Sequence, residues 1–180
     1  MFTQGKIGLT ASRLRWWQIA LITVGVSLLG SLSTGRSRKS ERKLYTTKLD
    51  QAPWAPPAWL FGVAWPLNNF FVLLALQQLL AGENMPEKKK LLILQAAIWI
   101  IFFSFGYVYF RKKSPVLAAV WTMSDAALSI ASFFLARRVD KKLSYYYLPL
   151  AVWTSYASTV ADYQALKNDD PALNLSAPLD

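Results

Sequence analysis

The chain has 180 residues, of which 54% are hydrophobic, and it carries a formal net charge of +10. It contains no cysteine and no histidine, which excludes disulfides, thiolate nucleophiles, Ser-His-Asp triads and metal sites built on imidazole or thiolate. A soluble nucleic-acid-binding domain would not usually be this apolar, so the composition favours a membrane protein over a nucleic-acid partner.

Five long stretches of the chain have at most one charged residue each. Three of them have none, and the other two contain Asp125 and Asp162 respectively. A helix of about 20 residues crosses a hydrocarbon layer of ~30 Å. We therefore predict an all-α, integral membrane bundle of five transmembrane helices. It forms a single domain over residues 1–180, with spans near 16–34, 56–81, 91–110, 115–136 and 143–166.

Helix-boundary residues agree with these spans. Gly82 follows the second span, Ser114-Pro115 opens the fourth, and Asn168 follows the fifth. The first span could instead be a cleavable signal peptide, because it lies behind two arginines; its length and the four later spans favour a retained helix. Residues 169–180 are acidic and are expected to be a disordered tail. Ten lysines and arginines lie on each side, so the positive-inside rule does not select an orientation. The sequence predicts a multi-pass membrane protein without indicating which membrane it occupies.

The turn before the second span is rich in tryptophan and proline. Pro56-Pro57 predicts a stiff, extended segment that leads into the helix. Trp54 and Trp59 fit an aromatic belt at the membrane interface, where indole rings lie at the headgroup level. Trp65 lies about two turns deeper, so its indole N–H should face protein or a cavity.

The spacing Trp54-x-Pro56-Pro57-x-Trp59, followed by Trp65, resembles the signature of the translocator protein family, also called tryptophan-rich sensory proteins (TspO/MBR). Five spans with a longer first loop are also similar to that family.

The fifth span keeps part of the family pattern. Pro149, Trp153 and Ala157 match its proline, tryptophan and small residue, whereas Leu150 replaces a tyrosine and Val160-Ala161 replaces Leu-Asn. The sequence therefore resembles a divergent member.

The resemblance implies a membrane receptor or transport-type protein in tetrapyrrole homeostasis or stress signalling. Its ligands would be porphyrins, including haem, and sterols or other flat apolar molecules, bound between helices with Trp65 and Trp153 flanking the pocket. It also implies contact with membrane lipids and a homodimer, and leaves light-dependent porphyrin breakdown, and so enzymatic activity, open. The candidate ligand-binding residues are Trp54, Pro57, Trp59, Trp65, Asn69, Trp153 and Ala157.

No obligatory cofactor is expected, and porphyrin or haem would be a ligand. Haem iron would find no histidine or cysteine in this chain, which leaves tyrosine, Met85 or Met123 as axial candidates. We therefore expect apolar enclosure without a strong axial bond.

Asp125 lies in the middle of the fourth span, where an ionised group is costly. One interpretation is structural: Asp125 forms an interhelical hydrogen bond, or it pairs on its own helix, where Ser129 four residues on is the best-placed partner. The other is a polar contact to a ligand, or a proton relay. Asp125 also supports the alternative function, a small secondary transporter or channel subunit, in which Pro66 and Pro149 would kink the helices. A third possibility is a membrane scaffold.

Three further patterns in the sequence are less specific for a function. Val160, Tyr163 and Lys167 match a sterol-contact pattern that is common by chance. Small residues four apart are compatible with close helix contacts and a homodimer; they are Ala118 with Thr122 and Ala127 with Ala131. Basic residues of the first loop are expected to attract propionates or anionic headgroups, or to be a solvated connector; they are Arg36, Arg38, Lys39, Arg42, Lys43 and Lys48.

Overall fold

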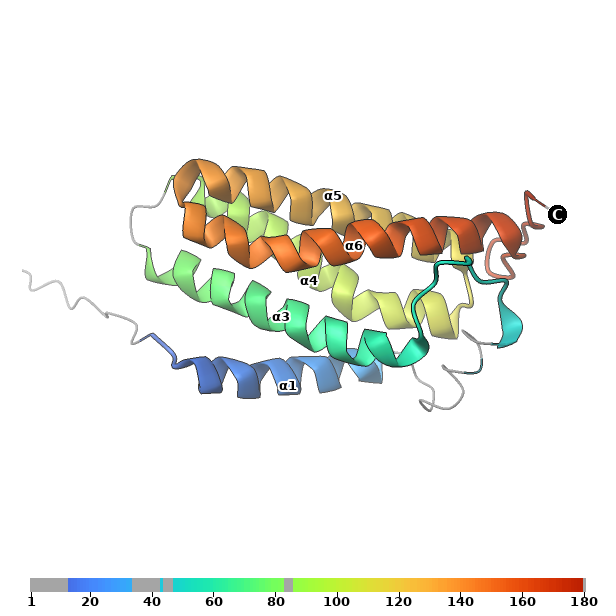
Figure 1. Cartoon of the computed structure of the whole chain (residues 1–180), viewed down its shortest axis with the longest axis horizontal. Coiled ribbons are helices and arrows are strands. Elements are labelled where there is room, and N and C mark those ends of the chain that lie inside the picture. The colour runs from blue at the N-terminus through green and yellow to red at the C-terminus, as the bar shows by residue number, and fades with distance from the viewer. Residues whose placement is uncertain (1–12, 34–42, 44–46, 83–85, 180) are drawn as a thin grey trace, which may run out of the picture.

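Figure 1 shows the computed structural model of the chain, which describes residues 13–33, 43, 47–82 and 86–179. The named elements of this part are helices, so the predicted all-α fold is confirmed. They are α1 (Trp16–Leu32), α3 (Ala58–Ala81), α4 (Lys88–Gly106) with the π-helical turn η2 (Tyr107–Arg111), α5 (Pro115–Val139) and α6 (Lys141–Lys167).

The helices lie along one common axis and alternate in direction (Figure 1). The most extensive contact is between α5 and α6, which a single residue, Asp140, joins. Helix α1 lies on the outside of the bundle and packs chiefly against α3 and α4. Only Ile19 and Thr23 are buried on α1, so most of its apolar surface faces outward.

Three of the described helices have the length and hydropathy of membrane spans. Helices α3, α4 with η2, and α5 are long and apolar enough to cross a bilayer, and α1 is a shorter apolar helix. Helix α6 has 27 residues but is less apolar. Polar residues in its middle and second half, such as Thr154 and Gln164, are buried, whereas the apolar residues Leu148 and Val152 are exposed. Polar groups inside and apolar groups outside are the arrangement that lipid favours.

Helix ends are set by side-chain caps. Ser114 caps α5 and Pro115 is its first residue, as predicted. Asp140 caps α6 by accepting hydrogen bonds from the backbone N–H groups of Lys142 and Leu143. Both helices extend further toward Asp140 than the predicted spans, because basic residues assigned to the loop lie on helix ends, from which their long side chains reach water.

The C-terminal tail is folded back, so the prediction that it is disordered is wrong for residues 169–179. Asp170 is 1% exposed, and its Oδ2 accepts hydrogen bonds from Ser114 Oγ and from the backbone N–H of Val116 at 3.1 Å. Its Oδ1 accepts from the backbone N–H groups of Ala172 and Leu173, each at 3.0 Å. The first turn of a helix has unpaired N–H groups and a positive dipole end, which together attract a carboxylate.

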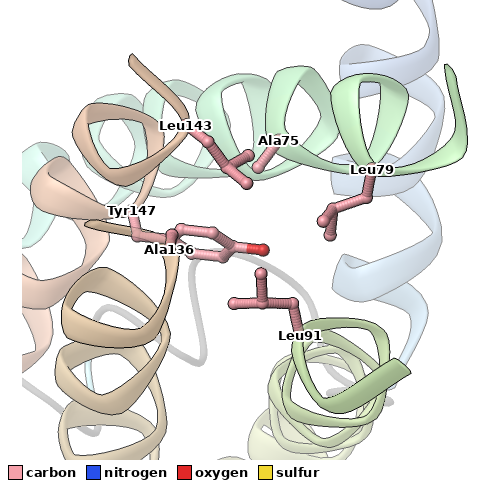
Figure 2. Close-up of a cluster of buried hydrophobic side chains, with 6 residues drawn as sticks. All are labelled: Ala75, Leu79, Leu91, Ala136, Leu143 and Tyr147. Carbon is pink, nitrogen blue, oxygen red and sulfur yellow. The ribbon is translucent and has the colours of Figure 1, made fainter. Parts of the chain in front are cut away.

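One end of the bundle is filled by a core cluster to which four helices contribute (Figure 2). We call it the packed end. Two polar side chains at this end are paired: Tyr147 OH donates to Gln95 Oε1 at 3.2 Å, and Gln95 Nε2 donates to the Val72 carbonyl at 2.6 Å. The six buried side chains, each 0% exposed, are Ala75, Leu79, Leu91, Ala136, Leu143 and Tyr147.

Candidate functional site: a cavity at one end of the bundle

The other end of the bundle contains a cavity of about 130 Å³. Its wall comes from the beginnings of α3 and α5, the end of α4 with η2, and the end of α6. Because neighbouring helices alternate in direction, these segments meet at the end opposite the packed end (Figure 1). We call it the cavity end. Its aromatic lining residues are Phe61, Trp65, Phe102, Phe105, Tyr109 and Phe110.

Small residues on α5 and α6 leave the space open. Ala118 and Thr122 are four residues apart on α5, and Ala157 and Ala161 are four apart on α6, so each pair lies on one helix face. All four line the cavity. The spacing of Ala118 with Thr122, which indicated a close helix contact, therefore contributes to a hollow inside the bundle.

The π-helical turn η2 turns extra aromatic side chains toward the cavity. The backbone N–H of Lys112 donates to the Tyr107 carbonyl at 2.9 Å, a bond that spans five residues instead of four. In this wider turn Tyr109 and Phe110 both line the cavity, together with Phe105. The rings of Phe105 and Tyr109 are stacked at 5.5 Å. Turns of this kind are frequent at functional sites.

Asp125 is the acidic residue in the described part of the cavity wall. It is 1% exposed, and neither carboxylate oxygen has a hydrogen-bond partner among the residues that the structure describes. Ser129, the expected partner, bonds instead with Thr154 Oγ1 on α6 at 3.1 Å. Among the described residues Asp125 therefore forms neither the expected pair with Ser129 on its own helix nor an interhelical hydrogen bond, and both expectations are wrong.

The two tryptophans expected to flank a pocket lie in different places. Trp65 lines the cavity, and its ring packs against Phe102 with centroids 5.7 Å apart. Trp153 lies outside the described lining and contacts the wall residue Phe61 edge-on, with centroids 5.5 Å apart. Trp153 is thus one side chain away from the cavity rather than in its wall.

The Trp-Pro segment before α3 contributes little to the cavity wall itself and mainly holds the start of α3 against α6. Pro56 lines the cavity, whereas Pro57 precedes the first residue of α3 and is exposed. Trp59 is 67% exposed at the start of α3, as an interfacial ring would be. Trp54 Nε1 donates to Thr159 Oγ1 at 3.1 Å and so ties the segment to α6.

Asn69 and the methionines lie away from the cavity lining. Asn69 is buried between α3 and α1, where its Nδ2 lies 3.5 Å from Ser27 Oγ, and it is not part of the cavity lining. Met123 is 52% exposed, and Met85 lies outside the described residues. No group of three His, Cys, Asp or Glu side chains suited to a metal ion occurs in the described ranges.

The residues of the weaker sequence patterns are dispersed. Val160 lines the cavity, but Tyr163 and Lys167 do not. Ala127 and Ala131 are exposed on the outer side of α5, where a homodimer contact stays a prediction. Of the basic first-loop residues, Lys43 and Lys48 are exposed; Arg36, Arg38, Lys39 and Arg42 lie outside the described residues.

Sequence reasoning missed most of the aromatic wall. Phe61 is one turn before Trp65, and Phe102, Phe105 and Tyr109 repeat every three to four residues, which is a helical face. That signal was hidden because these helices are apolar on all sides. Gln164 was also missed: it accepts a hydrogen bond from Tyr109 OH at 2.8 Å.

The comparison with known families agrees with this architecture. The sequence model of the TspO/MBR family matches residues 19–164, which covers most of α1, all of α3, α4 and α5, and α6 as far as Gln164. No curated protein matches the chain. The prediction of a multi-pass helical membrane protein is confirmed by this match and by the apolar helices. The chain belongs to the TspO/MBR family.

Proposed function

We propose that this protein binds porphyrins, and other flat apolar molecules such as sterols, in the cavity between α3, α4, α5 and α6. The observation that carries the proposal is the cavity wall, in which aromatic rings on one side face small residues on the other. Aromatic faces supply large, rigid contact areas for a flat ligand at low entropic cost. Membership of the TspO/MBR family supports a sterol- or porphyrin-binding or transport-type role in a membrane.

The size of the cavity sets a condition on porphyrin binding. Its volume is about 130 Å³. Ligand pockets usually measure roughly 300–1,000 Å³, so the wall has to open before a porphyrin fits. Changes of side-chain rotamer at a binding surface are common. A dry cavity of ~150 Å³ accepts benzene, so one- or two-ring aromatic molecules suit the cavity with little change.

The alternative functions have less support. A transporter of the predicted kind would show several interior charges or broken helices. Asp125 is the only charged residue in the described cavity lining, and Pro66 and Pro149 lie inside continuous helices. A pure scaffold has no need of a hollow bordered by small residues.

The test is a titration of the detergent-purified protein with protoporphyrin, followed by the change in porphyrin absorbance. We expect saturable binding, weakened several-fold by Trp65→Phe, because loss of an indole stacking face costs on the order of 1 kcal/mol. The matched control is Trp59→Phe, at an exposed position away from the cavity, which should bind as the wild type does.

Trp153→Phe should have an intermediate effect, because Trp153 supports the wall residue Phe61 without lining the cavity. Equal affinities in the wild type and Trp65→Phe, or the absence of saturable binding, would overturn the proposal.

A further inference from the structure

We propose that Asp125 makes the cavity selective for flat apolar ligands that carry a hydrogen-bond donor, either an N–H, an O–H or an ammonium group. This inference rests on the proposed function, because it names the ligand chemistry of the same cavity. It starts from a carboxylate that is 1% exposed, lines the cavity and has both oxygens unpartnered among the described residues.

A buried carboxyl group without a partner lowers the stability of the fold. Buried polar groups in proteins are nearly always hydrogen-bonded, and an acidic group inside a membrane bundle normally pairs with a neighbour. An apolar residue at position 125 would pack in the same place without that penalty. The cavity therefore contains a carboxyl group to which no described residue of the protein forms a hydrogen bond.

The neighbouring hydroxyl groups on α5 are already engaged. Thr122 Oγ1 donates to the Ala118 carbonyl at 2.7 Å, and Ser129 Oγ bonds both with the Ala126 carbonyl at 3.0 Å and with Thr154 across the helix pair. None of these hydroxyl groups forms a hydrogen bond with a carboxyl oxygen of Asp125.

The polar groups elsewhere in the wall are also paired. Tyr109 OH donates to Gln164 Oε1 at 2.8 Å, and Gln164 Nε2 donates to Gln51 Oε1 at 2.7 Å. The remaining lining is aromatic or aliphatic. A complementary ligand therefore has an apolar body and a donor aimed at Asp125, and it directs any carboxylates of its own away from that residue.

The contribution of this donor can be measured with two small molecules of matched shape, only one of which carries a hydrogen-bond donor. Indole has one N–H, and indene has the same two-ring frame with no donor; both are close in size to the cavity as it stands. We expect the wild-type protein in lipid nanodiscs to bind indole about tenfold more tightly than indene, as one additional hydrogen bond implies. Affinities come from the NMR shift of the Ala157 methyl group, with free concentrations corrected for partition into empty nanodiscs.

Three variants distinguish a role of Asp125 in ligand selectivity from a role in the stability of the fold. Asp125→Leu should abolish the indole preference and raise the unfolding temperature, because it replaces an unpaired polar group with an apolar one. Asp125→Asn keeps the size and one acceptor oxygen and should retain an intermediate preference. Thr122→Val is the matched control in the same wall; its hydroxyl bonds to its own helix, so the indole preference should persist.

Equal binding of the two probes by the wild type, or an unchanged preference in Asp125→Leu, would overturn the inference. A lower unfolding temperature in Asp125→Leu would also do so, because it would assign Asp125 a structural role. Protoporphyrin binding that depends on Trp65, without any indole preference, would leave the proposed function standing while this inference fails. An Asp125-dependent indole preference without porphyrin binding would reject porphyrin as the ligand and keep the selectivity.

Discussion

The two ends of the bundle are built from the same four helices but differ in how completely they are filled. At the packed end, six side chains are 0% exposed and the Tyr147 hydroxyl is hydrogen-bonded. At the cavity end, about 130 Å³ stays open and the Asp125 carboxylate has no partner in the described part of the chain. Close packing supplies stability, whereas a space with an unpaired polar group supplies a place for a ligand. The helices are therefore closely packed at one end and enclose an open space at the other, which is where we propose that a ligand binds.

Residue size explains the difference. At the packed end, the small residue Ala136 lies in the same cluster as the large ring of Tyr147, so small and large side chains interdigitate (Figure 2). At the cavity end, α5 and α6 both contribute small residues, Ala118 from one and Ala157 from the other, and the aromatic side chains of α3 and α4 do not fill the space between them.

The largest expected effect on stability is at the packed end. Leu143→Ala removes a side chain that is 0% exposed, and it should lower the free energy of unfolding by about 2–5 kcal/mol. Leu148→Ala, on the same helix but 41% exposed, is the control and should cost much less. Unfolding in detergent measures both. Equal costs would show that the packed end does not hold the bundle together.

The tail contact at the cavity end should matter next. Asp170→Ala removes the acceptor for Ser114 Oγ and for the N–H of Val116, and should cost about 1–3 kcal/mol. Limited proteolysis should then cut the tail faster. Asp169→Ala, at an exposed position with a single backbone contact, is the control. A tail equally protected in both variants would contradict this role of Asp170.

A larger side chain in the lining should fill the cavity, so that the cavity end becomes as closely packed as the packed end. Ala157→Leu places three more carbon atoms in the lining and should weaken porphyrin binding at least about tenfold, which is ~1.4 kcal/mol. Stability should stay the same or rise, because the added carbon atoms fit into the cavity. Ala131→Leu, on the outer side of α5, is the control and should leave binding unchanged. Full affinity in Ala157→Leu would place the ligand elsewhere.

The smallest expected effect comes through α1. A Cβ atom at Gly30 would lie 2.8 Å from Cε1 and Cζ of Phe102, so this cavity-wall ring has to move. Gly30→Ala should therefore weaken porphyrin binding several-fold, on the order of 1 kcal/mol. Gly25→Ala on the same helix meets nothing within 4 Å and controls for helix propensity. Equal protoporphyrin titration curves for the two variants would show that the packing of α1 does not affect binding in the cavity.

The fold could be predicted from the sequence because membrane spans leave a strong local signal. Long stretches without charge mark the helices, and Ser114-Pro115 marks a helix start by its chemistry alone. The depth of Trp65 also follows from counting turns. Such signals are local, so they survive without knowledge of neighbouring helices.

The cavity wall and the polar partners could not be predicted in the same way. Apolar helices show no preferred face in the sequence, so the inward position of Phe105 and Tyr109 depends on packing and on the π-helical turn. Ser129 was misassigned because its actual partner, Thr154, is on another helix. The tail was misjudged from its composition, because long-range hydrogen bonds from Asp170 to the start of α5 hold it in place.

The most direct measurement compares alanine methyl groups at the two ends of the bundle. In protein with labelled alanine methyls, protoporphyrin should shift the NMR signals of Ala118, Ala157 and Ala161 at the cavity end and leave those of Ala75 and Ala136 at the packed end in place. Shifts at Ala75 and Ala136 with none at Ala157 would contradict ligand binding in the cavity.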